Sequence, residues 1–211
     1  MIRVLLVDDH AVVRMGFRLL LQSNAEISVI AEADCGETAC QLFLELAPDV
    51  VVMDLAMPGM GGLEALRRIR ARQPHAKVLA LSAHDDVMRA RRTLQEGALG
   101  FLSKRSAPET LLEAVSTVAA GRHYIEPTLA QKLAIAEFDG GTRSPVDQLS
   151  EREFEVFVRL ARGTTVQRIA QDLNLSASTV GTHLYNIKQK LSVVNQSELT
   201  LIAIRHGLIE A

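Results

Sequence analysis

The chain contains little cysteine, little excess charge of either sign and no long apolar run. Its two cysteines, Cys35 and Cys40, are spaced neither as a metal-binding pair nor as a redox Cys-x-x-Cys motif, and a secreted disulfide scaffold would contain more of them. The net charge of −2 excludes a histone-like or polybasic binder. No run approaches the ~20 apolar residues of a membrane span, so no membrane partner is expected. The composition is typical of a globular protein with ordinary buried thiols.

The N-terminus also lacks the features of a secretion signal. Its apolar run, 4–7, is short and is followed at once by the carboxylates of Asp8 and Asp9. We therefore expect a cytoplasmic protein. The length of 211 residues allows one large domain or two small ones, either with a hydrophobic core.

The first half of the chain alternates short apolar runs with amphipathic stretches, a pattern typical of buried parallel strands joined by helices. The apolar runs are 4–7, 27–31, 50–53, 78–81 and 101–102, and the amphipathic stretches are 11–22, 36–46, 62–72, 86–96 and 107–119. Five such units predict the fold class α/β, with a five-stranded, doubly wound parallel sheet.

Polar side chains follow four of the predicted strands. They are Asp8 and Asp9 after the first strand, Asp54 after the third, Ser82 after the fourth and Lys104 after the fifth. In a doubly wound sheet, functional groups gather in the crevice at the carboxyl ends of the strands. We therefore expect these five groups to converge at one edge of the sheet.

The pattern changes after residue 121. A short helical segment at about 129–136 precedes residues 139–145, whose Gly, Ser and Pro are typical of a flexible linker. The predicted domains are therefore 1–121 and 145–211, with 122–144 as a linker that contains a short helix.

The second domain is all-α by pattern. A capping box at Ser150 begins a helix that ends at Gly163. Further helices are predicted at about 165–173 and 177–191, separated by a tight turn at 174–176. Two helices across so short a turn form a helix-turn-helix, whose second helix would enter a DNA major groove.

The acidic residues predict a metal site. Uncompensated, Asp8, Asp9 and Asp54 would repel one another, so such a cluster indicates a bound divalent cation, and oxygen-only ligands suit Mg²⁺. The six histidines show no metal-ligand spacing, and His10 is expected at a helix start rather than in the chemistry. An aspartate can also form an aspartyl phosphate when a lysine neutralises the phosphoryl charge, a role that fits Asp54 and Lys104.

Several segments resemble known families. Residues 7–10, 53–62, 81–83 and 100–104 are similar to the receiver domains of two-component response regulators, and residues 149–153, 169–170, 175–180, 183 and 186–191 are similar to the LuxR-type helix-turn-helix. Together they resemble the NarL/FixJ class. Residues 203–208 are most similar to its GacA/UvrY members, and residues 100–105 to its UhpA members.

The resemblance implies a regulator of transcription. A histidine kinase would phosphorylate Asp54, after which the chain would form a homodimer and bind DNA at paired half-sites. RNA polymerase is a further candidate partner. Two-fold dimers on paired half-sites also follow from the geometry of a helix-turn-helix.

The resemblance also implies roles for the receiver residues. Mg²⁺ would be bound by Asp9, Asp54 and the backbone carbonyl of Ala56, with Asp8 supporting it through water. Lys104 would pair with the phosphoryl group. Ser82 and Phe101 would form the switch pair, Ser82 drawn to the phosphate and Phe101 rotating inward, and His84 would influence water access.

The predicted DNA contacts lie on the outward face of the helix at 177–191. They are Ser178, Thr179, Gly181, Thr182, Tyr185, Lys188 and Lys190. Residues 159–190 carry five basic side chains against Asp172 alone, which predicts a local positive patch. Gly181 stands where the class usually has Lys, which indicates either a missing DNA contact or a close approach of the backbone to DNA.

Two other function classes remain open at this point. A phosphoryl-hydrolysing or nucleotide-binding enzyme is disfavoured because no Gly-x-Gly-x-x-Gly or Walker loop follows the first strand. A stable phosphate on Asp54 without turnover of a small substrate would reject it. A signalling adaptor that binds protein or RNA would be rejected by specific retention of a short palindromic duplex.

Overall fold

A computed structural model describes residues 1–83, 87–138, 145–173, 175–206 and 208–209. These residues form two compact units, Met1–Asp139 and Gly140–Ala211. His84, Asn174 and the predicted linker residues 139–144 lie outside the described residues. Within the described part of the chain, no helix is both long and apolar enough to cross a membrane.

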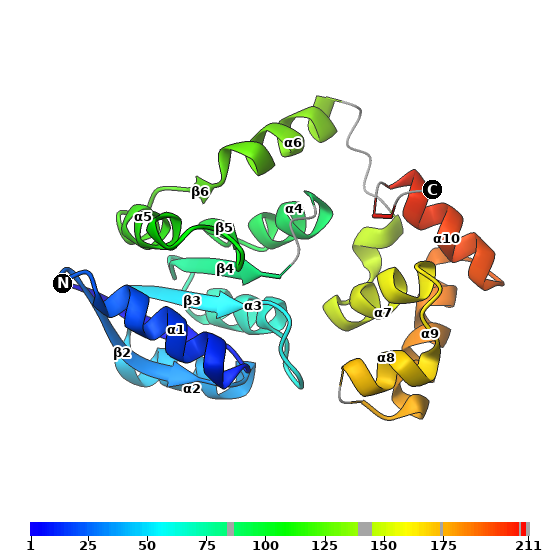
Figure 1. Ribbon diagram of the computed structural model, residues 1–211, viewed down its shortest axis with the longest axis horizontal. Helices are drawn as coiled ribbons and strands as arrows, with labels where there is room; N and C mark the ends of the chain where they lie inside the picture. The colour runs from blue at the N-terminus through cyan, green and yellow to red at the C-terminus, as the bar shows by residue number, and fades with distance from the viewer. Residues whose placement is uncertain (84–86, 139–144, 174, 207, 210–211) are drawn as a thin grey trace. The chain divides into compact units, whose positions relative to one another are not determined.

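The first unit is built on a parallel sheet with the order β2-β1-β3-β4-β5-β6 (Figure 1). The strands are β1 (Ile2–Val7), β2 (Ile27–Ala33), β3 (Val50–Asp54), β4 (Val78–Ser82), β5 (Gly100–Ser103) and β6 (Tyr124–Ile125). The first five match the predicted apolar runs to within two residues. The α/β, doubly wound class is therefore confirmed.

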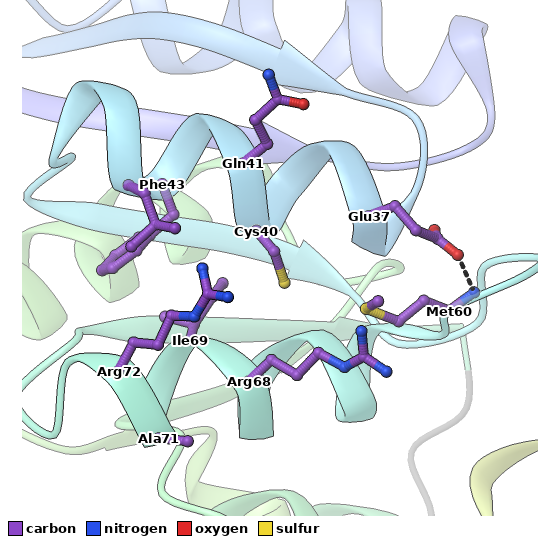
Figure 2. Close-up of a pocket in the computed structure, with 10 residues that line it drawn as sticks. Glu37, Cys40, Gln41, Phe43, Met60, Arg68, Ile69, Ala71 and Arg72 are labelled. Carbon is purple, nitrogen blue, oxygen red and sulfur yellow. Dashed lines mark hydrogen bonds between the residues drawn. The ribbon is translucent and has the colours of Figure 1, made fainter.

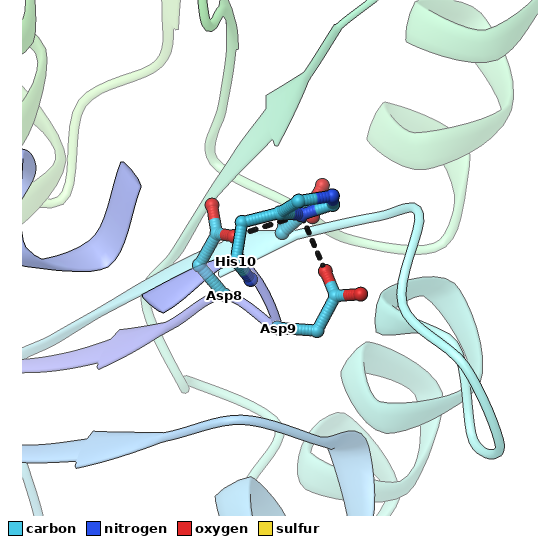
Figure 3. Close-up of side chains that lie close together, drawn as sticks. Asp8, Asp9 and His10 are labelled. Atoms are coloured by element: carbon cyan, nitrogen blue, oxygen red, sulfur yellow. Dashed lines mark hydrogen bonds and ion pairs between the residues drawn. The ribbon is translucent and has the colours of Figure 1, made fainter. Parts of the chain in front are cut away.

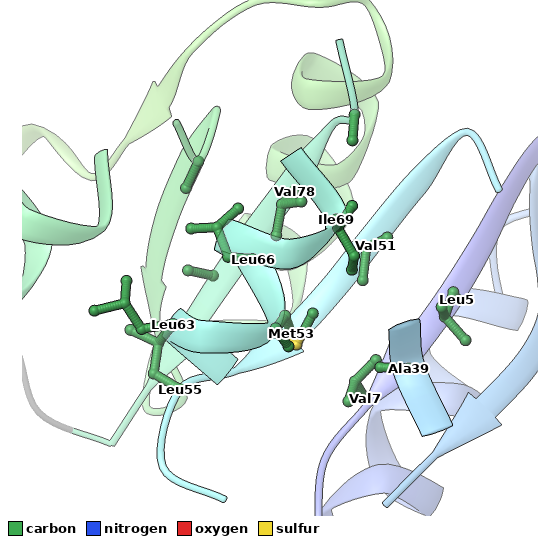
Figure 4. Packing of buried hydrophobic residues seen from close by; sticks show 14 of the residues in the cluster. Leu5, Val7, Ala39, Val51, Met53, Leu55, Leu63, Leu66, Ile69 and Val78 are labelled. Atoms are coloured by element: carbon green, nitrogen blue, oxygen red, sulfur yellow. The ribbon is translucent and has the colours of Figure 1, made fainter. Parts of the chain in front are cut away.

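Helices cover both faces of this sheet because alternate side chains of each strand enter two different cores. On one face, strand residues such as Leu5 and Met53 pack against α2 (Gly36–Leu46), α3 (Gly62–Arg72) and α4 (Val87–Gln95), as Figure 4 shows for part of this core. On the other face, the strands pack against α1 (Ala11–Gln22) and α5 (Pro108–Ala119). Because the strands are buried on both faces, their sequences are continuous apolar runs.

The structure adds a sixth strand to the five that the sequence predicts. β6 pairs in parallel with β5, and the Tyr124 amide donates to the Leu99 carbonyl at 2.9 Å. The helix after it, α6 (Pro127–Phe138), contacts α4 and buries Leu129 in the α2–α3–α4 core. Residues 122–138, predicted as linker, therefore belong to the first compact unit. A two-residue strand carries no periodic pattern, which is why the sequence does not indicate it.

The second unit is helical, as predicted. It contains a 3₁₀ turn, η1 (Pro145–Gln148), followed by α7 (Glu151–Ala161), α8 (Val166–Asp172), α9 (Ala177–Leu191) and α10 (Gln196–Arg205). The predicted capping box is present, since Ser150 and Glu153 exchange hydrogen bonds at the start of α7. α8 and α9 form the predicted helix-turn-helix, and α9 buries Val180, Ile187 and Leu191.

Candidate functional site

Three charged side chains meet at the point where the strand order of the sheet reverses. β1 and β3 are neighbours whose chains leave in opposite directions, which is where α/β sheets bind ligands. Asp8 follows β1, Asp54 ends β3 and Lys104 follows β5. The Lys104 Nζ lies 2.6 Å from Asp8 Oδ2 and 2.7 Å from Asp54 Oδ2. The predicted convergence of these groups is therefore present.

The two aspartates are almost completely buried, with 0% of Asp8 and 1% of Asp54 exposed. Burial raises the pKa of Asp54, although the Lys104 ammonium and the Ala56 amide act in the opposite direction. Burial alone would lower the pKa of Lys104, but the carboxylates of Asp54 and Asp8 outweigh it and raise that pKa. Lys104 therefore stays protonated and supplies the positive charge that a second anion on Asp54 would need.

Asp9 and His10 complete an acidic cluster around this lysine site. One ligand atom from each of Asp8, Asp9, His10 and Asp54 lies within 4.8 Å of the others. The His10 Nδ1 is 2.9 Å from Asp9 Oδ1. Figure 3 marks this contact with a dashed line. His10 precedes α1 as its N-cap, as expected, but its side chain also reaches the cluster. Only its position next to Asp9 could have indicated this contact.

The donor set of the cluster fits a hard divalent cation. Three carboxylates supply oxygen atoms, which Mg²⁺ prefers, and the partly exposed Asp9 leaves room for bound water. Asp8 and Asp54 are already neutralised in part by Lys104. A cation would offset the remaining negative charge.

The other predicted receiver residues lie at or near the carboxyl ends of β3, β4 and β5. The Ala56 amide donates to Asp54 Oδ1 at 3.1 Å, so the start of the loop is held to the carboxylate. Ser82 is buried at the end of β4, and its carbonyl accepts from the Lys104 amide at 2.8 Å. Phe101 is fully buried in the same core as Leu129 of α6. The Phe101 side chain therefore lies inside this core.

The start of α3 is packed directly onto the backbone of Asp54. A Cβ atom at Gly62 would lie 2.0 Å from the Asp54 carbonyl oxygen, so no side chain fits there. The Gly62 amide donates to the Leu55 carbonyl at 3.2 Å. Gly59 has φ +70°, a conformation that favours glycine. These glycines hold the loop after β3 close to the acidic site.

In the second unit, the first two turns of α9 present small polar side chains. Ser176 caps the helix by accepting from the Thr179 amide at 3.0 Å, and Ser178 and Thr182 are exposed. Tyr185 is 64% exposed on the same helix. A Cβ atom at Gly181 would meet nothing within 4 Å. These side chains are available for contact with a ligand.

The two predicted lysine contacts are held within the protein. The Lys190 Nζ is 2.6 Å from Glu153 Oε2, and this glutamate is the buried capping-box residue of α7. The Lys188 Nζ donates to the Val194 carbonyl at 2.8 Å. A buried carboxylate requires a cation, which explains why Lys190 turns toward α7 instead of pointing outward.

The predicted positive patch is also smaller than the sequence indicates. Arg159 and Arg168 both pair with Asp172, at 3.2 and 3.0 Å. Arg159 also pairs with Glu155 at 3.4 Å. Helical spacing could have indicated the i,i+4 pairs Arg168–Asp172 and Arg159–Glu155, whereas it does not reveal the Arg159–Asp172 pair, which joins α7 to α8.

Both parts of the chain match known families. Residues 4–116 match the response regulator receiver domain, and residues 147–203 match the luxR family of bacterial regulatory proteins. Over its whole length the chain is 42% identical to response regulator GacA of Pseudomonas aeruginosa, and covers 99% of it. The chain belongs to the two-component response regulators. Response regulator UvrY of Escherichia coli is also 42% identical, across 100% of this chain and 97% of UvrY.

Solved response regulators have the same architecture. A LuxR-family regulator from Aurantimonas sp. SI85-9A1 aligns with 65% of this response regulator and 99% of its own chain, at 38% identity and a TM-score of 0.63. RcsB from Salmonella enterica serovar Typhimurium aligns with 95% of this chain and 97% of its own, at 25% identity and a TM-score of 0.62. These relatives support a role in regulating transcription and disfavour the alternative of a hydrolytic enzyme.

Proposed function

We propose that this response regulator is phosphorylated on Asp54 by a histidine kinase, then dimerises and binds DNA sequence-specifically at paired half-sites. The observation that carries the proposal is the Lys104 ammonium held between the buried carboxylates of Asp8 and Asp54. This arrangement prepares the site for one further negative charge. Such a regulator works in the cytoplasm, where it meets DNA and, as a further partner, RNA polymerase.

The acceptor step follows from this geometry. An oxygen of the Asp54 carboxylate attacks the phosphorus of a phosphohistidine, the phosphorus–nitrogen bond breaks, and the histidine nitrogen leaves with the electron pair. Lys104 stabilises the charge on the phosphoryl oxygens. Asp8, Asp9, Asp54 and the Ala56 carbonyl would hold Mg²⁺, which when bound neutralises phosphoryl charge. The protein supplies position and charge rather than turnover.

Ser82 and Phe101 would couple phosphorylation of Asp54 to a conformational change. The Ser82 hydroxyl donates to a phosphoryl oxygen on Asp54 and moves the end of β4, and Phe101 occupies the space beside it. Phe101 and Leu129 of α6 belong to the same hydrophobic core, so a movement of Phe101 can act on α6 through that core. The added charge therefore acts on a core that includes a residue of α6, the last helix before the second domain in the chain.

The DNA contacts would come from α9. Ser178, Thr179, Thr182 and Tyr185 carry the hydrogen-bonding groups, and Gly181 adds no side-chain contact in the open space around it. Lys188 and Lys190 would contact DNA only after breaking their contacts with the Val194 carbonyl and the Glu153 carboxylate. One solved relative, RcsB, is described as bound to promoter rprA in the presence of phosphomimetic BeF₃⁻, which supports this mode of action.

The function is tested by DNA binding before and after phosphorylation. With a small acyl phosphate donor and Mg²⁺, we expect the affinity for a selected palindromic duplex to rise by roughly 5- to 150-fold, the usual range of coupling between two sites. A scrambled duplex should show no such increase. Fluorescence anisotropy measures both affinities. Equal affinities for the two duplexes in both states would reject the proposal and favour the adaptor alternative.

The Ser82→Ala variant separates phosphorylation from its effect. Asp54 and Lys104 are untouched, so the variant should still accept a phosphoryl group. It lacks the hydroxyl that donates a hydrogen bond to the phosphoryl group, so the increase in dimerisation and DNA affinity on phosphorylation should be smaller than in wild type. Sedimentation and binding isotherms provide the measurement. An undiminished increase would remove Ser82 from the switch.

The Gly181→Lys variant tests the departure at the recognition helix. The open space around Gly181 accommodates the side chain, so we expect tighter DNA binding and a salt dependence steeper by about one phosphate contact. Titrations against one operator at several salt concentrations measure both. Gly181→Ala is the control, because it removes the ~0.5–1 kcal/mol cost of a helical glycine without adding charge. Weaker specific binding by the Lys variant, with an intact fold, would instead indicate close backbone approach to DNA.

A further inference from the structure

A groove on the first unit lies outside the acidic site. It runs between α2 and α3, has a volume of about 480 Å³ and is lined by side chains of both helices and by Met60 of the loop before α3 (Figure 2). This volume lies within the range of small-molecule sites. A neighbouring hollow shares Phe43, Leu44 and Arg72 with it, so the groove continues along the two helices.

The floor of the groove is apolar. Phe43 and Ile69 are buried at its base, Met60 lies at one end, and Leu44 is 50% exposed on α2. Burying an exposed leucine against an apolar ligand is favourable by about 25 cal/mol for each Å² removed from water. The groove therefore favours a ligand with an elongated, apolar body.

Two guanidinium groups reach from α3 over this floor, as Figure 2 shows. Arg72 forms no hydrogen bond or ion pair with any residue that the structure describes. Among the described residues, Arg68 bonds only to Glu64, through its Nε at 2.9 Å, so its two terminal nitrogens can donate to a ligand. These donors can bind an anionic head group.

The charge of the lining limits that head group to one negative charge. Arg68 already pairs with Glu64, which lies outside the lining, so Arg72 is the lining arginine that pairs with no carboxylate of a described residue. The Glu37 Oε1 already accepts from the Met60 amide at 3.1 Å, which keeps this carboxylate at the end of the groove. A dianion would meet this carboxylate without enough positive charge to compensate.

We propose that the α2–α3 groove binds a small amphipathic carboxylate, with the carboxylate on Arg72 and Arg68 and the apolar body on Phe43, Ile69 and Met60. The site is separate from Asp54 and does not depend on phosphorylation. It would give the receiver domain an input from a small molecule in addition to its input from a kinase.

Cys40 provides a direct readout, because its half-buried thiol lines the groove while that of Cys35 does not. We use octanoate as the probe and measure the rate at which iodoacetamide alkylates each cysteine at mildly alkaline pH, by peptide mass spectrometry. Octanoate should slow the alkylation of Cys40 and leave the rate at Cys35 unchanged. Uncharged 1-octanol should protect Cys40 much less. Equal protection of both cysteines, or equal protection by octanol, would overturn the proposal.

Arginine variants test the head-group contact. Arg72 is exposed, so Arg72→Gln should fold normally, and it should raise the octanoate concentration needed for half-protection by about tenfold, the effect of losing one charge-assisted hydrogen bond. Arg122→Gln, an exposed arginine away from the groove, is the matched control and should not change it. Equal effects of the two variants would reject the site. Protection of Cys40 that rises with protein concentration without octanoate would identify a second copy as the occupant, and would also overturn the proposal.

Discussion

The Asp54→Asn variant should incorporate no phosphoryl group under conditions in which the wild-type chain incorporates one. The amide that replaces the carboxylate has no negatively charged oxygen to attack phosphorus, and Asp8, the other buried carboxylate of this cluster, already accepts from Lys104 and the His10 amide. The loss should be complete rather than partial. Intact-mass measurement with a small phosphodonor and Mg²⁺ gives the result directly.

A matched variant makes this result specific. Asp34→Asn removes an exposed carboxylate that follows β2 and should leave incorporation unchanged. The DNA-affinity increase should disappear with Asp54→Asn and persist with Asp34→Asn. Undiminished labelling of the Asp54 variant would move the acceptor to another residue and remove the basis of the proposed function.

The Lys104→Met variant should lose about 3–5 kcal/mol of unfolding free energy at neutral pH without Mg²⁺, because it leaves Asp8 and Asp54 buried without their cation. Mg²⁺ should restore part of this loss, since it stabilises only the folded state. The pKa of Asp54, already raised by burial, should rise further without the lysine. A folded-state pKa above the unfolded value means that protonation favours folding, so the loss should shrink as pH falls through that pKa.

Urea unfolding with and without Mg²⁺, at neutral and acidic pH, measures these effects. Lys132→Met, which removes an exposed lysine on α6, is the control and should change stability little. If both variants unfold at the same urea concentration, Lys104 does not neutralise the buried carboxylates. If Mg²⁺ stabilises neither the wild type nor the Lys104 variant, the acidic cluster does not bind this metal.

Most of the architecture could be predicted because it depends on local patterns. β3 and β4 are buried on both faces, so 50–53 and 78–81 are continuous apolar runs. The convergence of Asp8, Asp54 and Lys104 then follows from topology alone, since parallel strands present their carboxyl ends at one edge. The helix-turn-helix was predictable for a similar reason, as its caps and apolar spacing are local.

The features that the sequence did not predict depend on contacts between residues far apart in the chain or on side-chain orientation. Lys190 pairs with Glu153, 37 residues earlier, so its outward position on a helical projection did not predict its direction. The acidic cluster also includes the His10 side chain, whose orientation depends on rotamer and not on position in the sequence. The α2–α3 groove is a property of how two helices pack, and no motif marks it.

The sixth strand determines where a stable fragment of this receiver domain can end. β5 would be an edge strand if the chain ended at residue 121, and the backbone groups that now pair with Tyr124 and Ile125 would face solvent. The same truncation removes α6 and would expose the apolar side chains of the α2–α3–α4 core that Leu129 covers. An unprotected edge beside apolar surface is a template for pairing with another chain. A fragment ending after residue 138 should stay monomeric, whereas one ending at residue 121 should associate edge to edge. Oligomers of the shorter fragment would then reflect its truncation and not the dimerisation that phosphorylation induces.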